Sequence, residues 1–417
     1  MKKRLLIMGA TSETVKMAET AEAMGTETWV ADPFPDALAK KACSHPLDID
    51  CFDTDAICGI IEEHSIYGVL PGCADILMAP YEEVCRRMSK PCYVNEDIVK
   101  VFNNKAGLKR ALEKAGLPTV PEYSVSQTED EAFSRFPVFV KPVDNNSSKG
   151  MSVAGDHREF RAALEKALSF SRSKTVLIEE VMECDDFYVG YFLQDGHAAV
   201  TFTGDRYVNA EQKGLGSITS GIVYPSKYEK LYFETAHDRM LSLFDSLGFG
   251  NGILNIQGFV RNGEIMFYDP ALRITGGQEY VMSKHFYSLD ILKCLVNFAL
   301  TGSMGDPDLY KLCDHTFGGR CGCNLTFSVK PGVIGRIEGM DHAKKDPHVI
   351  NITQEHAEGA VIDRPGTAQQ NFARMHIAAD SRDELKKVIA DLQAHVRAFD
   401  SEGSDMMLKG LDPEKIR

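Results

Sequence analysis

The first hundred residues alternate short apolar runs with longer stretches of mixed polarity. Apolar runs at residues 5–8, 28–31 and 68–70 each have the length of a buried strand. Residues 15–24, between the first two runs, have the composition of a helix. Strands separated by helices in this way are typical of parallel sheets with crossover helices. We therefore predict an open parallel α/β domain over residues 1–97.

A helix stop followed by prolines marks a junction in the chain. A helix rich in Lys, Leu and Ala is predicted from Asn104 to Gly116, where the glycine ends it. Pro118 and Pro121 then prevent its continuation. We place a second domain, with both α/β and α+β character, over residues 98–302.

The second domain combines two patterns. Residues 119–190 hold short apolar strands and one helix, which predicts a small α+β lid module. From residue 187 onward, strand-length runs follow one another, and Arg261-Asn262-Gly263 has the composition of a hairpin turn. This predicts a larger antiparallel sheet. Residues 303–417 form a predicted C-terminal α+β extension, with a helix at 381–399. Whether this extension closes a pocket, extends the sheet or forms a dimer stays open.

Composition narrows the range of partners. The chain has 417 residues, of which 60 are acidic and 46 basic, for a formal net charge of −14. Without a basic run, such a chain is poorly suited to nucleic acid. No apolar run reaches the roughly 18 residues of a membrane-spanning helix, and Gly9 ends the N-terminal run too early for a signal peptide. Eleven irregularly spaced cysteines indicate reduced thiols rather than zinc ligands or disulfides. We expect a cytoplasmic protein that binds neither nucleic acid nor membrane.

The start of the chain also allows a dinucleotide site. Gly9 follows a strand and Asp32 comes some twenty residues later, which is how a nicotinamide-binding fingerprint begins. Residues 9–14 contain one glycine where that fingerprint needs three. An oxidoreductase is therefore an alternative with weak support, and Gly9 is otherwise a tight strand-to-helix turn.

Two lysines and a loop of small residues suggest phosphate binding. Lys105 opens the helix before the junction, and Lys141 ends an apolar strand. The loop that follows contains Ser147, Ser148, Lys149 and Gly150. Lysine charges and the closely approachable N–H groups of such a loop suit a triphosphate. The alternative for the loop is a solvated surface turn.

Oxygen-bearing side chains gather further along the chain. Glu179, Glu180 and Val181 end one strand and Asp186 begins the next. Their acceptors suit the amino group and hydroxyls of a nucleoside, or else they form a solvated acidic bend.

A second group of polar residues lies on the predicted hairpin. Because alternate residues of a strand share a face, Gln257 and Asp269 are expected to converge. Their oxygen atoms suit magnesium, and Arg273 beside them suits a phosphate.

Taken in order, these motifs resemble the ATP-grasp superfamily of carboxylate ligases over residues 1–303. The resemblance implies a nucleotide clamped between the small module and the larger sheet. It assigns Lys105 and Lys141 to the ATP phosphates and residues 147–151 to a mobile flap. It also assigns Glu179 to Val181 to the adenine hinge, Asp186 to the ribose, Gln257 and Asp269 to the metal, and Arg273 to phosphate.

One position departs from the superfamily's Glu-x-Asn-Pro-Arg pattern. The corresponding segment here is Asp269-Pro270-Ala271-Leu272-Arg273, so Ala271 replaces an asparagine that ligates magnesium. An alanine side chain cannot coordinate a cation. We hypothesise that Asn255, two residues before Gln257 on the same strand, supplies the missing oxygen together with water. Whether one or two metals bind stays open.

The function that the resemblance implies is an ATP-dependent carboxylate–amine or carboxylate–thiol ligase that forms an acyl phosphate. It would use ATP with Mg²⁺ or Mn²⁺, with Lys141 and Arg273 as catalytic residues. The expected substrates are an amino-acid-like carboxylate and an amine, and the assembly a monomer or homodimer. Two alternatives remain: a non-catalytic ATP-binding regulatory protein, favoured by Ala271, and a biotin carboxylase-like enzyme that activates bicarbonate.

Overall fold

A parallel sheet forms the N-terminal unit, as the alternating apolar runs predict. The computed structural model describes residues 2–143, 150–209 and 218–417, and it orders the first sheet β3-β2-β1-β4. The elements of this unit are β1 (Arg4–Met8), α1 (Ser12–Ala23), β2 (Glu27–Ala31), β3 (His45–Leu47), α2 (Thr54–Glu63), β4 (Gly68–Pro71) and α3 (Met78–Arg87). All its strand pairs are parallel. The loops after β1 and β4 therefore leave the same edge of the sheet, where ligands bind in open α/β sheets.

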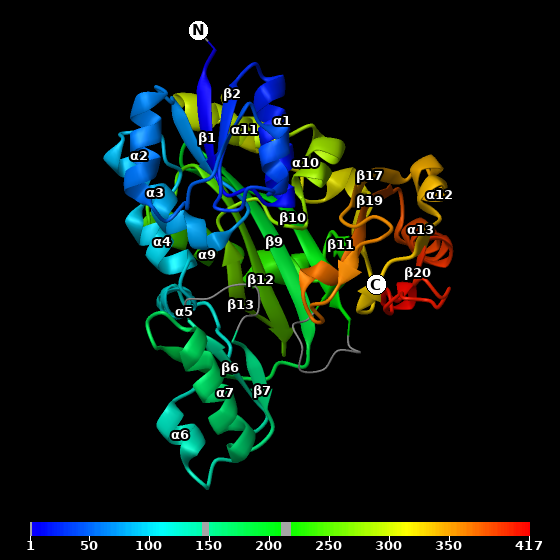
Figure 1. Ribbon diagram of the computed structural model, residues 1–417. Coiled ribbons are helices and arrows are strands. Elements are labelled where there is room, and N and C mark those ends of the chain that lie inside the picture. Colours follow the sequence, from blue (N-terminus) through cyan, green and yellow to red (C-terminus); the bar gives the residue numbers. More distant parts are fainter. Residues whose placement is uncertain (1, 144–149, 210–217) are drawn as a thin grey trace.

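Helix α11 (Ile291–Thr301) joins this unit to a distant part of the chain. It packs on α1 and β4, as Figure 1 shows. A Cβ atom on Gly68 would lie 2.0 Å from the carbonyl oxygen of Ala299. Only glycine permits so close an approach, so this contact fixes the N-terminal unit against the rest of the molecule.

A four-stranded antiparallel sheet forms the lid module. Its order is β5-β8-β6-β7. Its elements, with the two helices that lead into it, are α4 (Glu96–Phe102), α5 (Lys105–Lys114), β5 (Glu122–Tyr123), α6 (Val125–Glu129), β6 (Val138–Pro142), β7 (Ser152–Ala154), α7 (His157–Phe170) and β8 (Val176–Glu180). Phe160, Ala163 and Ala167 of α7 share one helix face and pack on Val138 and Ile178.

A long antiparallel sheet runs through the rest of the molecule. Its eight strands are ordered β13-β12-β9-β10-β11-β14-β19-β17. They are β9 (Asp185–Gln194), β10 (His197–Val208), β11 (Thr219–Tyr224), β12 (Gly252–Arg261), β13 (Glu264–Ala271), β14 (Cys321–Ser328), β17 (Val349–Gln354) and β19 (Asn371–Ala379). The predicted hairpin is confirmed, since Asn262 and Gly263 have the positive φ angles of a tight turn. Strands β14, β19 and β17 show that the C-terminal residues extend the sheet.

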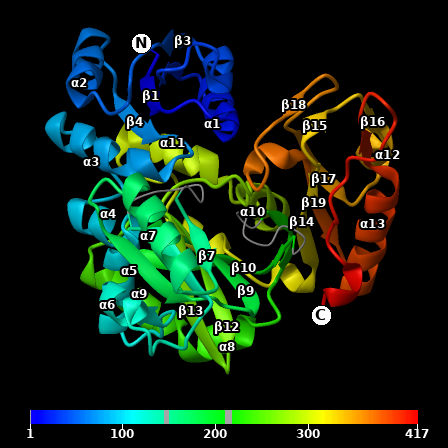
Figure 2. The same cartoon turned by 60° about the horizontal axis from the view of Figure 1, so that its bottom comes forward.

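The remaining α-helices and short strands lie outside this sheet, and the short strands form two two-stranded sheets. They are α8 (Glu229–Thr235), α9 (His237–Ser246), α10 (Tyr280–Tyr287), β15 (Gly332–Val333), β16 (Arg336–Glu338), α12 (Met340–Lys345), β18 (Val361–Ile362), α13 (Arg382–His395) and β20 (Arg397–Phe399). The helix predicted at 381–399 is therefore too long. Its last residues leave the helix because they pair with β16 as β20, a tertiary contact that helical periodicity cannot reveal. Figure 2 shows α12, α13 and β16 together in a C-terminal unit beside the main body.

Two further predictions concern the thiols and the membrane. All eleven cysteines are free, and six of them are buried. Within the part of the chain that the structure describes, no helix combines the length and apolarity required to cross a bilayer.

Candidate active site

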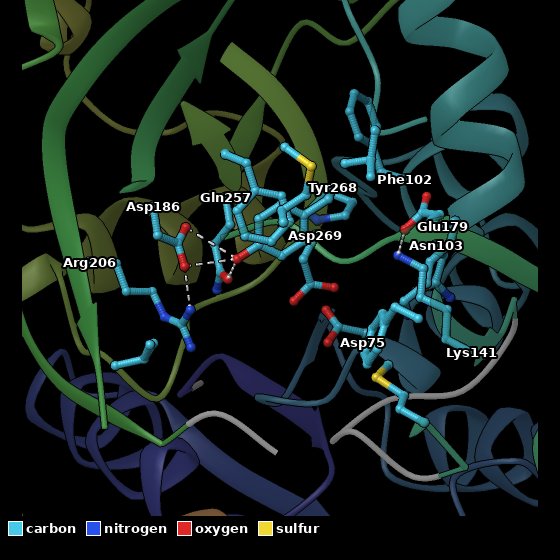
Figure 3. A pocket seen from close by; sticks show the side chains of 18 of the residues that line it. Asp75, Phe102, Asn103, Lys141, Glu179, Asp186, Arg206, Gln257, Tyr268 and Asp269 are labelled. Atoms are coloured by element: carbon cyan, nitrogen blue, oxygen red, sulfur yellow. Dashed lines mark hydrogen bonds and ion pairs between the residues drawn. The ribbon is translucent and has the colours of Figure 1, made fainter. Parts of the chain in front are cut away.

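A cavity of about 1560 Å³ lies where the N-terminal unit, the lid module and the long sheet meet. The loop after β4, the ends of β6 and β8, and strands β9, β10, β12 and β13 all contribute to its walls. Figure 3 shows the polar side chains of these elements directed into it. Its volume exceeds that of most sites for one small ligand, so it has room for a nucleotide and a second molecule.

A carboxylate with two lysine neighbours lies at the lid side of the cavity. The Nζ atom of Lys141, on β6, is 2.5 Å from one carboxylate oxygen of Glu179 on β8. Lys109 of α5 approaches the other oxygen at 3.5 Å. All three side chains are buried. Only Lys141 and Glu179 line the cavity, so Glu179 orients Lys141 toward it, whereas Lys109 stands behind.

Lys105 lies at the first turn of α5, where the preceding asparagine caps the helix. The Oδ1 atom of Asn104 accepts a hydrogen bond from the backbone N–H of Gly107 at 2.9 Å. Asn104 and Lys105 both line the cavity. A lysine at a helix N-terminus adds its charge to the positive end of the helix dipole, which suits an anion.

The predicted phosphate loop lies mostly outside the described residues, which leave out Ser147, Ser148 and Lys149. Gly150 is described and has a φ of +78°. A Cβ atom there would lie 2.6 Å from the Cβ of Phe170 on α7. The next residues, Met151 and Ser152, line the cavity.

The end of β8 has a charged contact, and apolar side chains surround it in the cavity wall. Glu180 accepts a hydrogen bond from Arg261 at 2.7 Å. Val181 and Glu180 both line the cavity. The apolar side chains around them in the wall are Phe102, Val120, Phe139, Met182 and Phe259. A flat aromatic base fits such a wall, and backbone atoms of the hinge would contact its edge.

Asp186 has partners that the sequence did not indicate. It accepts hydrogen bonds from Arg206 on β10 at 2.5 Å and from the Tyr268 hydroxyl at 3.1 Å (Figure 3). The same hydroxyl lies 2.7 Å from Gln257 Oε1, so its single proton is shared between the two acceptors. Burial raises the pKa of Asp186, and the neighbouring charge of Arg206 acts against that rise. The aspartate is thus held in a network that links β9, β10, β12 and β13.

The candidate metal ligands come from two paired strands and one loop. Gln257 of β12 and Asp269 of β13 are direct partners across the hairpin. Asp75, which follows β4, also lines the cavity, and its carboxylate and that of Asp269 point into the same region (Figure 3). Asp75 was missed from the sequence, although its position after a parallel strand is where such sheets place ligand contacts.

Asn255 lies apart from these ligands. Its Nδ2 atom donates to the backbone carbonyl of Arg273 at 3.4 Å. It lines a separate, water-sized cavity together with Glu279, not the large one. It shares the face of Gln257, but two residues along a strand span roughly 7 Å, so the structure does not bring Asn255 together with Gln257 and Asp269.

Arg273 connects the hairpin to the N-terminal unit. Its Nη2 atom pairs with Asp75, and its Nη1 atom donates to the carbonyl of Ile274 at 3.0 Å. Burial opposes the charge of Arg273, but Asp75 and Cys73 raise its pKa above the ordinary value. It therefore stays positively charged at the cavity wall.

A second polar group lies on β11, β14 and β19 and at the start of α10, and none of its residues lines the large cavity. Glu279, Arg374 and Asn324 are buried. Among the described residues, the side-chain atoms in this group that lack a hydrogen-bond partner are Glu279 Oε1, Arg374 Nε and Nη1, Asn324 Oδ1, Tyr224 OH and Tyr280 OH. Arg374 has only a loose ion pair with Glu355, at 3.7 Å. Burial raises the pKa of Glu279, against the charges of Arg374 and Arg273. Buried polar groups are rarely left unpaired, and the water-sized cavity that Glu279 and Tyr280 line has room for water to complete some of these bonds.

Asp32 and Gly9, on which the dinucleotide alternative rests, have structural roles. Asp32 accepts hydrogen bonds from the backbone N–H groups of Ala10 and Phe34, both at 2.9 Å. Its carboxylate thus stabilises the turn after β1, and Gly9 is that turn's first residue.

Two family models match parts of the chain. The model of the D-ala D-ala ligase C-terminus matches residues 111–228, and that of the L-amino acid ligase C-terminal domain 2 matches residues 325–398. The formate-dependent phosphoribosylglycinamide formyltransferase of Methylococcus capsulatus is 26% identical over 282 residues, which cover 65% of this chain and 69% of that protein.

Solved structures show the same fold at low sequence identity. The L-amino acid ligase from Bacillus licheniformis matches with a TM-score of 0.79 at 16% identity, covering 96% of this chain and 99% of that one. The N5-carboxyaminoimidazole ribonucleotide synthetase from Thermotoga maritima matches with a TM-score of 0.71 at 15% identity, covering 96% and 100%. The biotin carboxylase domain of the Hydrogenobacter thermophilus 2-oxoglutarate carboxylase, in complex with MgADP and bicarbonate, matches with a TM-score of 0.74 at 13% identity, covering 97% and 91%. Together with the lid, hairpin and parallel unit described above, these matches confirm the predicted resemblance to the ATP-grasp superfamily and show that the chain has the fold of its ATP-dependent ligases.

Proposed function

We propose that this chain joins an amino-acid-like carboxylate to an amine, with ATP as the energy source. The observation that carries the proposal is the buried group around Glu279 and Arg374, in which a carboxylate oxygen and the guanidinium Nε lack a hydrogen-bond partner and Nη1 has a loose ion pair with Glu355. An amino acid offers the complementary pair, an ammonium and a carboxylate. Burying either of these charges without a partner would be costly, and the group could pair with both. Because Glu279 lines the water-sized cavity and Arg374 lines neither cavity, the proposal requires the large cavity to extend to this group when the amino acid binds.

The cations at the lid side are proposed to bind the phosphates of ATP. Lys141 and Lys105 line the cavity from two elements, and Met151 and Ser152, which follow Gly150, line it as well. The apolar wall near Met182 and Phe259 is proposed to hold the adenine. The same assignment extends to Glu179, Glu180 and Val181 at the hinge and Asp186 at the ribose.

The oxygen donors of Asp269, Gln257 and Asp75 fit a hard divalent cation, because carboxylate and amide oxygens are its usual ligands. Mg²⁺ bound there, or Mn²⁺ on the same ligands, would neutralise phosphate charge. Asp75 replaces Asn255 in this proposal as the group that offsets Ala271, since Asp75 lines the cavity and Asn255 does not.

The reaction needs no covalent intermediate on the protein. A carboxylate oxygen of the substrate attacks the γ-phosphorus of ATP, and ADP leaves with the electrons of the broken bond. The amine then attacks the acyl carbon, and inorganic phosphate leaves carrying the former carboxylate oxygen. A thiol would react in the same way. Lys141 and Arg273 stabilise the negative charge that shifts between oxygens in the first step.

The proposal is tested by phosphate release from Mg-ATP with pooled amino acids, formate and bicarbonate, with mass spectrometry of the products. We expect release that requires amino acids and yields a condensed product. In Arg374→Met, the KM for the amino acid should rise at least tenfold while ATP binding persists. Release driven equally by bicarbonate alone would support the biotin carboxylase-like alternative, and ATP binding without release in any pool would support the regulatory one.

A further inference from the structure

Two histidines and an aspartate meet at the surface of the C-terminal unit, away from the cavity. His342 lies on α12, and Asp391 and His395 lie on α13. One potential ligand atom from each lies within 4.8 Å of the others. His342 Nε2 is 2.6 Å from Asp391 Oδ2, and His395 Nδ1 is 3.2 Å from Asp391 Oδ1. The aspartate therefore lies between two imidazoles.

The backbone holds these side chains close together. Helices α12 and α13 pack side by side (Figure 2), and the strands next to them pair, with Glu338 opposite Arg397. Gly339, with a φ of +80°, begins α12 directly against the end of α13. A Cβ atom on it would lie 2.2 Å from the carbonyl oxygen of His395. Glycine thus permits the approach that brings His342 beside His395.

The local contacts also orient the rings. Asp391 and His395 are four residues apart on α13 and so share a helix face. The rings of His342 and His395 stack with their centroids 4.2 Å apart. His395 Nδ1 donates to the backbone carbonyl of Asp391 at 2.9 Å, which places the ring proton on Nδ1 and leaves Nε2 as the nitrogen that can bind a metal. Each of the three side chains is close to half exposed, so an ion and its water ligands can reach them.

The ligand set matches the chemistry of a borderline divalent metal. Zinc binds histidine nitrogen and aspartate oxygen at about 2.0–2.2 Å, which places neighbouring ligand atoms roughly 3.3 Å apart in a tetrahedron. The contacts of Asp391 with His342 and His395, at 2.6 and 3.2 Å, are close to that value, and one ligand atom from each of the three side chains lies within 4.8 Å of the others. Magnesium prefers six oxygen ligands, and the imidazoles exclude it in favour of zinc.

We propose that His342, Asp391 and His395 bind one Zn²⁺ ion that clamps α12 to α13, with water completing the coordination. The site is independent of the ligase site, since its residues do not line the cavity. Its function would be to stabilise the C-terminal unit that extends the long sheet.

The test uses the full chain without a histidine tag, stripped of metal and kept reduced, and titrated calorimetrically with ZnCl₂ in the presence of excess MgCl₂. We expect one zinc per chain, a higher melting temperature with zinc, and at least a tenfold weaker affinity in His342→Ala and in Asp391→Asn. Asp391→Asn keeps the side-chain shape, so its loss of affinity would not reflect unfolding. Phosphate release should be unchanged in both variants.

His348→Ala is the matched control, because His348 also lies in the C-terminal unit and contacts two carboxylates, Asp346 and Glu384. It should bind zinc as the wild type does. Zinc bound equally well by the His342 and Asp391 variants, as the eleven free thiols would allow, would overturn the proposal. Absence of zinc binding, or its displacement by magnesium, would overturn it as well.

Discussion

Glu179 shows how a single residue positions charged side chains at the wall of this cavity. Its two oxygens contact Lys141 at 2.5 Å and Lys109 at 3.5 Å. A buried carboxylate that pairs with two lysines offsets the cost of burying their charges. Only Lys141 lines the cavity. Lys141 is therefore placed to contact a ligand, whereas Lys109 contributes to stability.

Replacing Lys141 with Met is therefore expected to lower kcat/KM for phosphate release by about 100- to 1000-fold, because a cation that offsets developing charge is lost. Lys109→Met is the control, since it removes the other partner of Glu179 from behind the cavity wall. It should lower the melting temperature and leave kcat/KM within tenfold. Steady-state phosphate release by both variants would decide this, and equal losses would contradict a direct role for Lys141.

At the scale of the elements, the contact between α11 and β4 depends on a glycine, Gly68, which has no side chain. The carbonyl of Ala299 occupies the space that a Cβ atom of Gly68 would need. The strand carrying Gly68 leads to Asp75, which pairs with Arg273 across 198 residues of sequence. The packing of α11 on β4 therefore helps position one wall of the cavity.

Gly68→Ala should lower the free energy of unfolding by about 3 kcal/mol through overpacking. Gly59→Ala, in α2, is the control, because nothing lies within 4 Å of an added Cβ atom there. It should stabilise the protein by about 0.5–1 kcal/mol through helix propensity. Denaturant unfolding of both variants provides the measurement, and a neutral Gly68→Ala would show that α11 can shift away.

The elements also show which features a sequence can predict. Helix α5 and the β12–β13 hairpin were predicted because glycine stops and turn residues act locally. The pairing of Asp186 with Arg206 and of Arg273 with Asp75 depends on tertiary contacts that no local pattern encodes. The hypothesis for Asn255 had a local weakness. Strand alternation places it on the face of Gln257, but two residues along a strand span roughly 7 Å, and Asn255 lines the separate small cavity.

At the scale of the whole molecule, a buried histidine lies where the C-terminal strands contact the loop before Glu279. His376 of β19 is fully buried, and its Nε2 atom lies 2.9 Å from the carbonyl oxygen of Gly277, to which it donates. Asn324 donates to the same carbonyl at 2.7 Å. These bonds tie the C-terminal strands to the loop before Glu279. Burial lowers the pKa of His376 from 6.5 to about 3.

Acid should therefore destabilise the fold through His376. Between pH 6.5 and about 3 the unfolded chain binds a proton that the folded chain does not. The contribution of His376 to stability is thus greatest above pH 6.5 and falls by up to about 1.4 kcal/mol per pH unit below it. His376→Gln keeps a neutral donor and should show a shallower loss of stability between pH 6.5 and 4, measured by urea unfolding. An unchanged slope would assign the acid sensitivity to other groups.

The central claim is that this cavity activates a carboxylate as an acyl phosphate, and oxygen transfer tests it most directly. The amino acid that supports turnover is labelled with ¹⁸O in its carboxylate, and the released phosphate is analysed by mass spectrometry. The account predicts one ¹⁸O atom in each phosphate, because the carboxylate oxygen that attacks the γ-phosphorus leaves with it. Unlabelled phosphate would mean that water attacks ATP directly, and label in AMP would mean activation as an adenylate; either result would contradict the account.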